Sequence, residues 1–192
     1  MLTNTKYVYN FEEGSKDMKL LLGGKGAGLA EMTRIGLRTP PGFTITTEAC
    51  NYYFKNNKLP PGLWDTIVQS VQALEAKTGR VFGGAPKILL VSVRSGAPVS
   101  MPGMLDTVLN LGMNDQNVEL FSQESNNPRF AWDSYRRFIQ MFARIVLGLK
   151  GNKFDEVIEK KKKGLNLTND FELSEKDWKE IDNWIKEKSC CS

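Results

Sequence analysis

The sequence of 192 residues contains no histidine, and several kinds of enzyme chemistry are excluded with it. Ser-His and Cys-His nucleophile pairs, zinc sites with histidine ligands and the kinase catalytic loop that begins with histidine all require this residue. Any chemistry in this chain must therefore use lysine, arginine, carboxylates, hydroxyls or backbone amides.

Cysteine is scarce, and long apolar runs are missing. The three cysteines are odd in number, and Cys190 and Cys191 are adjacent at one end. This pattern argues against a disulfide framework and favours a reducing compartment. The longest apolar stretch, around Ile88–Val91, is far too short to span a bilayer, and the amino terminus has no apolar signal core. We expect a soluble protein of the cytoplasm or another reducing intracellular compartment, with no membrane partner.

The charge balance does not indicate a nucleic-acid partner, because 26 basic and 22 acidic residues are interspersed along most of the chain. The exception is the run of four lysines at 160–163. These lysines resemble the last turn of an exposed helix, where cations oppose the helix dipole and Gly164 ends the helix. A contact with a polyanion is the alternative interpretation of this run.

The character of the sequence changes near residue 112. Before it, most of the 17 glycines and seven of the eight prolines separate short segments. Patterns of alternation and helical spacing predict strands at 7–11, 43–46 and 107–111, and helices at 26–35, from an N-cap at Thr47 to about 55, and from residue 63. The nearly continuous apolar run Ile88–Val93 is typical of a strand buried on both faces of a sheet.

After residue 112 the chain is helical in pattern. Asn127-Pro128 predicts a helix start, and Ser174 with Asp177 resembles a capping box. An apolar stripe follows each start. The first consists of Ala131, Tyr135, Phe138, Phe142, Ile145 and Leu149, and the second of Trp178, Ile181 and Ile185. We expect Arg136, Arg137 and Arg144 to lie outside the first stripe. We therefore predict an α/β (α+β) fold, in which residues 1–112 form a small mixed sheet with flanking helices and residues 113–192 form a helical subdomain.

The segment GGKGAGLAEM, residues 23–32, could bind phosphate. Three alternating glycines surround Lys25 where a loop is expected to become a helix, and such a turn brings backbone amides and an ammonium group close to an anion. The segment does not match the P-loop pattern, because no second glycine stands five residues before Gly24 and no Ser or Thr follows Lys25. It does not match the G-x-G-x-x-G pattern either, because Leu29 occupies the position of the third glycine. A glycine-rich packing turn with a solvated lysine is an equally good interpretation of the residues alone.

The segment VSVRSGAPVSMPGMLDT, residues 91–107, is the second candidate. Arg94 is expected at the carboxyl end of a strand, where open α/β sheets bind ligands, and its guanidinium suits phosphate. A structural ion pair is the alternative for Arg94. Gly103 could bring amides near Met104 to an anion, while Thr107 offers a hydroxyl.

Taken together, these segments resemble a specific family. GGKGAGLAEM, PPGFTITTEAC, LPPGLWD, LLVSVRSGA, SMPGMLDTVLNLGMND and RFAWDSYRRFIQMF occur in the order and spacing of the amino-terminal region of the pyruvate, phosphate dikinases. The similarity covers roughly residues 7–148. Phosphoenolpyruvate synthase and the glucan dikinases share the lysine and arginine themes but are less similar over the segment that begins at Ser100.

The resemblance implies a partial ATP-grasp nucleotide-binding domain. In this family the lysine of the glycine loop and the arginine of the following strand contact ATP phosphates, which assigns those contacts to Lys25 and Arg94. The loop after the arginine implicates Gly103, Met104 and Thr107 as well, with Asp106 as a further candidate. Magnesium accompanies ATP in the complete enzyme, but the resemblance assigns neither a metal ligand nor a catalytic residue to this chain.

The resemblance also implies that the chain is a truncated part of an enzyme. The family reaction converts ATP, phosphate and pyruvate to AMP, pyrophosphate and phosphoenolpyruvate through a histidine on a separate domain and a carboxy-terminal barrel. Both are missing here, so we expect the chain alone to be inactive and to need the remaining domains or a partner chain. The alternatives are a non-catalytic binding or regulatory fragment that pairs with another polypeptide, and an inactive gene fragment.

Overall fold

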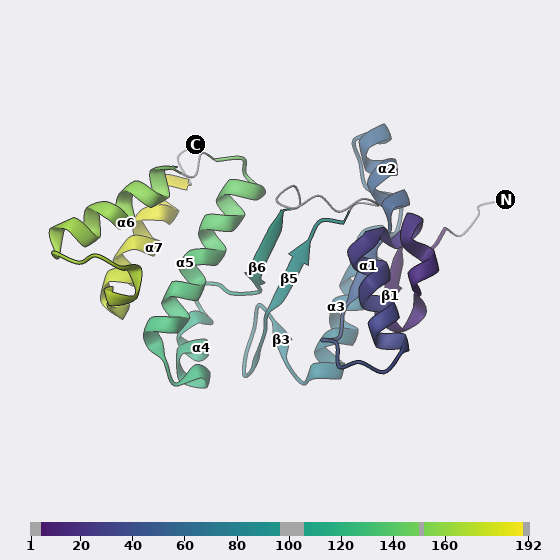
Figure 1. Ribbon diagram of the computed structural model, residues 1–192, viewed down its shortest axis with the longest axis horizontal. Helices are drawn as coiled ribbons and strands as arrows, with labels where there is room; N and C mark the ends of the chain where they lie inside the picture. The colour runs from purple at the N-terminus through teal and green to yellow at the C-terminus, as the bar shows by residue number, and fades with distance from the viewer. Residues whose placement is uncertain (1–4, 97–105, 150–151, 190–192) are drawn as a thin grey trace. The chain divides into compact units, whose positions relative to one another are not determined.

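The computed structural model describes residues 5–96, 106–149 and 152–189 (Figure 1). The chain divides into two compact units. The first comprises Met1–Gly79 and Ser95–Leu105, and the second comprises Arg80–Arg94 and Asp106–Ser192. None of the described helices is long and apolar enough to cross a membrane.

The first unit is a strand pair surrounded by helices. Strands β1 (Val8–Asn10) and β2 (Phe43–Ile45) are antiparallel, with Tyr9 opposite Thr44. The helical elements of this unit are η1 (Phe11–Glu13), η2 (Lys16–Met18), α1 (Lys19–Arg34), α2 (Thr47–Asn56) and α3 (Leu63–Thr78). Both predicted strands are confirmed, in slightly shorter form.

Two helix starts in the first unit differ from the prediction. Helix α1 begins at Lys19 and not near residue 26, because helical turns exist on both sides of a kink at Gly23. The N-cap of α2 is Thr46, whose Oγ1 accepts a hydrogen bond from the backbone amide of Ala49 at 3.3 Å. Thr47 does not cap this helix; its hydroxyl donates to the carbonyl oxygen of Leu20 at 2.7 Å.

The second unit contains two more strand pairs and four α-helices within its described residues. Strands β3 (Val81–Phe82) and β4 (Ile88–Leu89) are parallel, and β5 (Val91–Arg94) and β6 (Thr107–Leu111) are antiparallel. The helical elements are α4 (Val118–Ser125), α5 (Pro128–Ile145), α6 (Asn152–Gly164), η3 (Asp170–Glu172) and α7 (Glu175–Ser189).

The apolar run at 88–93 was predicted to be one strand buried on both faces, and this prediction is wrong. The run is divided at Leu90, so β4 pairs with β3 while β5 pairs with β6. Ile88 and Leu89 are buried, whereas Val93 is half exposed. The described residues thus form three two-stranded sheets instead of one mixed sheet.

The core of the second unit lies among its helices. The predicted α7 stripe is confirmed, since Trp178, Ile181 and Ile185 are buried. The capping box is confirmed too, because Ser174 and Asp177 exchange hydrogen bonds through their side chains and amides. Of the predicted stripe that begins at Ala131, Tyr135 belongs to the same cluster, and Phe138 and Leu149 pack against it while only partly buried.

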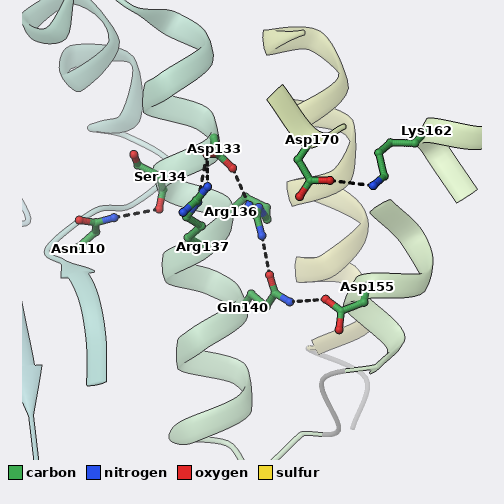
Figure 2. Close-up of polar contacts among 9 residues, drawn as sticks. All are labelled: Asn110, Asp133, Ser134, Arg136, Arg137, Gln140, Asp155, Lys162 and Asp170. Carbon is green, nitrogen blue, oxygen red and sulfur yellow. Dashed lines mark hydrogen bonds and ion pairs between the residues drawn. The ribbon is translucent and has the colours of Figure 1, made fainter. Parts of the chain in front are cut away.

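Arg136 is buried, contrary to the prediction that it lies outside the α5 stripe. Its guanidinium lies over the ring of Trp178, 4.7 Å from the ring centre, and donates to Asp133 at 2.6 Å and to Gln140 at 2.7 Å. Gln140 in turn donates to Asp155 of α6 at 2.9 Å, as Figure 2 shows. A flat guanidinium can cover an indole face while its edge keeps polar partners, so burial of this charge is tolerated.

The lysine run at 160–163 ends helix α6 as predicted, but it is not uniformly solvated. Lys162 is buried and pairs with Glu159 at 2.6 Å. It also pairs with Asp170 at 2.9 Å (Figure 2). Its ammonium also donates to the carbonyl oxygen of Thr168 at 3.4 Å. These contacts hold the segment after α6 against the helix.

The compact units do not divide at residue 112. The strands of 80–94 and 107–111 group with the helices of the second unit, because α5 packs on β6 and Asn110 donates to the carbonyl oxygen of Ser134 at 3.3 Å. The helical subdomain at 113–192 therefore remains a prediction.

Candidate functional site

The glycine segment of α1 contains a backbone conformation that favours glycine. Gly23 has φ 70° and ψ 171°, which interrupts the helix and starts a new helical stretch directly after it. A residue with a Cβ atom is strained in this region, so the kink depends on glycine. Lys25 lies two positions later, in the first turn of the second stretch, where backbone amides have no partner within the helix.

The Lys25 side chain extends toward the segment that follows strand β5. Its ammonium nitrogen donates a hydrogen bond to the backbone carbonyl oxygen of Ser95 at 3.3 Å. This contact is at the long end of the hydrogen-bond range and is exposed to water. A weak contact to a neutral acceptor leaves the ammonium able to exchange that acceptor for an anion.

The glycines around Lys25 have different local roles. A Cβ atom on Gly26 would lie 2.8 Å from the side chain of Thr44, so this glycine allows α1 to pack on strand β2. A Cβ atom on Gly28 would meet no atom within 4 Å. Gly26 therefore supports the packing interpretation, while Gly28 leaves the helix surface open.

Arg94 and Thr107 lie side by side. They are directly opposite each other in the β5–β6 ladder, so their side chains are on the same face of this sheet. Arg94 is exposed and makes no ion pair with the described residues, which does not support the structural ion pair considered above. Together the pair presents a guanidinium and a hydroxyl, the donor set that suits a phosphate oxygen.

The other predicted residues are less informative. Asp106 is exposed and adjacent to Thr107 at the start of β6. Gly103 and Met104 lie outside the described residues. The structure thus brings together two pairs, Lys25 with the Ser95 carbonyl and Arg94 with Thr107.

The opposite end of α1 is held by Glu31. Its carboxylate accepts hydrogen bonds from Arg34 at 2.6 and 3.0 Å and from the Lys16 backbone amide at 3.2 Å. These contacts, with Arg34 as the main cause, lower the pKa of Glu31 to about 2. The ionised carboxylate links the first residue of η2 to the last turns of α1.

The described residues contain no group of three or more Cys, Asp or Glu side chains that could hold a metal ion. Magnesium prefers several oxygen ligands in octahedral geometry, and one exposed carboxylate such as Asp106 does not meet that need. The donors described here therefore do not fit a resident magnesium site, and no step is assigned to that ion.

Two features of the candidate site were not predicted from the sequence. The Ser95 carbonyl is a backbone group, which no residue pattern identifies. The left-handed Gly23 was a weak signal, because the paired glycines at 23–24 before a helix are consistent with several turn types.

Comparisons with known proteins agree with the motifs. Residues 19–78 match the family described as "Pyruvate phosphate dikinase, AMP/ATP-binding domain". The chain is 52% identical over 177 residues to the pyruvate, phosphate dikinase of Entamoeba histolytica, covering 91% of this chain and 20% of that protein. The dikinase of Rhizobium meliloti is 49% identical over 187 residues, covering 95% of this chain and 21% of the relative.

A chloroplastic pyruvate, phosphate dikinase of Flaveria pringlei is 51% identical over 186 residues, covering 93% of this chain and 19% of that protein. The chain therefore spans about one fifth of the length of these relatives. The predicted similarity to the pyruvate, phosphate dikinases is confirmed: the chain resembles about one fifth of such an enzyme, and residues 19–78 match its AMP/ATP-binding domain.

Proposed function

We propose that this chain contributes an ATP-phosphate site to a pyruvate, phosphate dikinase and adopts part of an ATP-grasp fold. Lys25 and Arg94 contact phosphate oxygens, and Thr107 donates its hydroxyl beside them. Gly103 and Met104 supply the loop amides, with Asp106 as a further candidate. The parent reaction converts ATP, phosphate and pyruvate to AMP, pyrophosphate and phosphoenolpyruvate.

The hydrogen bond from Lys25 to the carbonyl oxygen of Ser95 is the observation that carries this proposal. Ser95 is the residue directly after Arg94 in the chain, so the lysine contacts the segment that adjoins the arginine, although the two cations are 69 positions apart in the sequence. The Arg94–Thr107 pair adds a second donor group on the same strand ladder. Each charge-assisted hydrogen bond contributes roughly 1.5 to 3 kcal/mol, so two cations make a large share of a nucleotide's binding free energy.

The chain by itself lacks what phosphoryl transfer requires. A phosphoryl group needs an acceptor in line with the bond that breaks, and the histidine of the family reaction is absent from the composition. ATP chemistry also needs carboxylates for magnesium, which would have to come from the remaining domains of a dikinase or from a partner chain. We therefore propose that this chain binds ATP weakly and transfers no phosphoryl group.

A titration of the chain with ATP and magnesium, followed by calorimetry or NMR, tests the proposal. We expect a dissociation constant no better than about 0.1 to 1 mM. Arg94→Ala should weaken binding by at least about tenfold, which is about 1.4 kcal/mol. Arg144→Ala is the matched control, because Arg144 is an exposed arginine on α5. Equal affinity of the Arg94 variant and the parent chain would overturn the assignment.

The second candidate function is a non-catalytic fragment that pairs with another polypeptide. It is favoured by large exposed apolar side chains in the first unit, of which Leu20, Phe54 and Trp64 are more than 60% exposed. A partner polypeptide would cover such side chains and remove their apolar surface from water. Sedimentation of the chain mixed with a candidate partner polypeptide, with and without ATP, separates the two functions, because pairing would raise the mass without requiring the nucleotide.

A further inference from the structure

Asp182 is a carboxyl group without a partner inside the second unit. It is 0% exposed, and neither carboxyl oxygen has a hydrogen-bond partner among the described residues. It belongs to the apolar stripe of α7, one residue after Ile181 and four after Trp178. A buried carboxylate without a partner is strongly unfavourable, so this position calls for an explanation.

The charges around Asp182 come from three segments. Helix α5 contributes two charged groups and a phenol, the segment before α4 contributes one carboxylate, and α7 itself contributes one lysine; these groups are Asp133, Tyr135, Arg136, Asp115 and Lys186. Helices α6 and α4 direct their own charges to other residues of α7, because Lys161 pairs with Asp177 and Glu180, and Glu119 pairs with Lys179.

Both nearby cations already have anionic partners. Arg136 pairs with Asp133 at 2.6 Å, and Lys186 pairs with Asp115 at 2.5 Å. No described cation lies within ion-pair distance of the Asp182 carboxyl group. An ionised Asp182 would therefore be buried without a counter-ion, while a protonated one avoids the cost of burying a charge.

We propose that Asp182 is a proton-linked switch in the α5–α7 packing: α7 packs on α5 with this carboxyl group protonated, and loss of the proton loosens the packing of α7. Arg136 offers a hydrogen-bond donor to the ionised carboxylate in the loosened state. Its Nε atom is buried and has no hydrogen-bond partner among the described residues. A shift of α7 could thus give an ionised Asp182 a guanidinium partner that the packed state does not provide.

The direction of the pH dependence follows from the burial. Burial raises the pKa of Asp182 to about 8, with the neighbouring carboxylates adding to it and the nearby cations opposing it. An aspartate in the unfolded chain has a pKa of about 3.9. Between these two values the unfolded state has lost its proton and the packed state retains it, so stability decreases as the pH rises.

Hydrogen exchange of the α7 amides in the full chain tests this proposal. Asp182→Asn preserves the shape of the side chain and removes its titration, and Glu187→Gln on the exposed face of α7 is the matched control. Between about pH 5 and 8, we expect protection in the parent chain to fall relative to Asp182→Asn by about tenfold per pH unit. Comparison at equal pH cancels the intrinsic change in exchange rate. Glu187→Gln should follow the parent chain.

A second measurement on the unmodified sequence keeps the test decisive if Asp182→Asn does not fold. The 13C resonance of the Asp182 carboxyl group should titrate far above pH 5 in the folded chain. A parallel pH profile of the parent chain and Asp182→Asn, or a carboxyl resonance that titrates near pH 4, would overturn the proposal.

Discussion

The two units of this molecule use their apolar residues in different ways. The second unit gathers aromatic and branched side chains in one cluster that includes Trp132, Tyr135 and Trp178. The first unit has two small clusters, one of which is built from Leu22, Ala27 and Ala30. Many of the larger apolar side chains of the first unit are exposed instead.

This difference shows how stability and binding are distributed along the chain. Large buried side chains contribute most to the free energy of unfolding, and they are concentrated in the helices that carry no predicted site residue. The glycine segment of α1 buries little apolar area, because glycine and alanine have small side chains or none. It gains close backbone packing at Gly26 and an accessible ammonium at Lys25.

The largest expected effect comes from two tryptophans with opposite exposure. Trp178 is 0% exposed and Trp64 is 64% exposed. Trp178→Ala should lower the free energy of unfolding by about 3 to 5 kcal/mol, because it leaves a cavity and removes the aromatic face under Arg136. Trp64→Ala should change it by no more than about 0.5 kcal/mol. Denaturant unfolding followed by circular dichroism measures both; similar losses would contradict the contrast between the units.

A pair of glycine variants sharpens the comparison within α1. Gly26→Ala should destabilise the chain by about 1 to 3 kcal/mol, because the new Cβ atom would overlap the stiff side chain of Thr44. Gly28→Ala meets open space and should stabilise the helix by about 0.5 to 1 kcal/mol. Thermal unfolding of the two variants gives the sign directly. If both variants are neutral, Gly26 is not a packing glycine.

The smallest effect concerns Glu31, which links η2 to α1. Because its pKa is lowered to about 2, its contribution to stability is fully present above about pH 4.5 and is lost as the pH falls through 2. Glu31→Gln should therefore differ from the parent chain at pH 5 and converge with it near pH 2. The control is Glu156→Gln, an exposed carboxylate on α6. Denaturation midpoints between pH 2 and 6 measure the convergence; a constant difference would contradict it.

Much of the helical structure was predictable, because its signals are local. Twelve consecutive residues contain both the capping box at Ser174 and the stripe of Trp178, Ile181 and Ile185. Asn127 likewise caps α5, its side chain accepting from the Phe130 amide at 3.0 Å. Residue spacing over a few positions determines these features, so they can be predicted from the sequence.

Features that depend on distant partners were not predictable in the same way. Arg136 and Lys162 are buried because Trp178 and Asp170 lie beside them in the fold, whereas the pattern of charges in the sequence alone indicates exposure to solvent. The division of the apolar run at Leu90 depends on which strands lie beside it. Asp182 had a signal that was not recognised, since it interrupts the α7 stripe at a position four residues after Trp178.

The candidate site shows the same division. The glycine and arginine segments could be found from their residue types and from the family resemblance. The Lys25 contact with the Ser95 carbonyl and the pairing of Arg94 with Thr107 required the fold, because both join segments that are distant in the sequence.

We expect phosphate to bind at the glycine segment and the Arg94 strand, while the helical core only supports the fold. An NMR titration of the uniformly 15N-labelled chain with ATP and magnesium tests it most directly. We expect the changes in amide chemical shift to concentrate at residues 23–28 and 94–107, while the amide resonances of α5 and α7 stay in place. Shifts concentrated at the lysines of 160–163 would instead identify the lysine run as the anion site and rule out the assignment to Lys25 and Arg94.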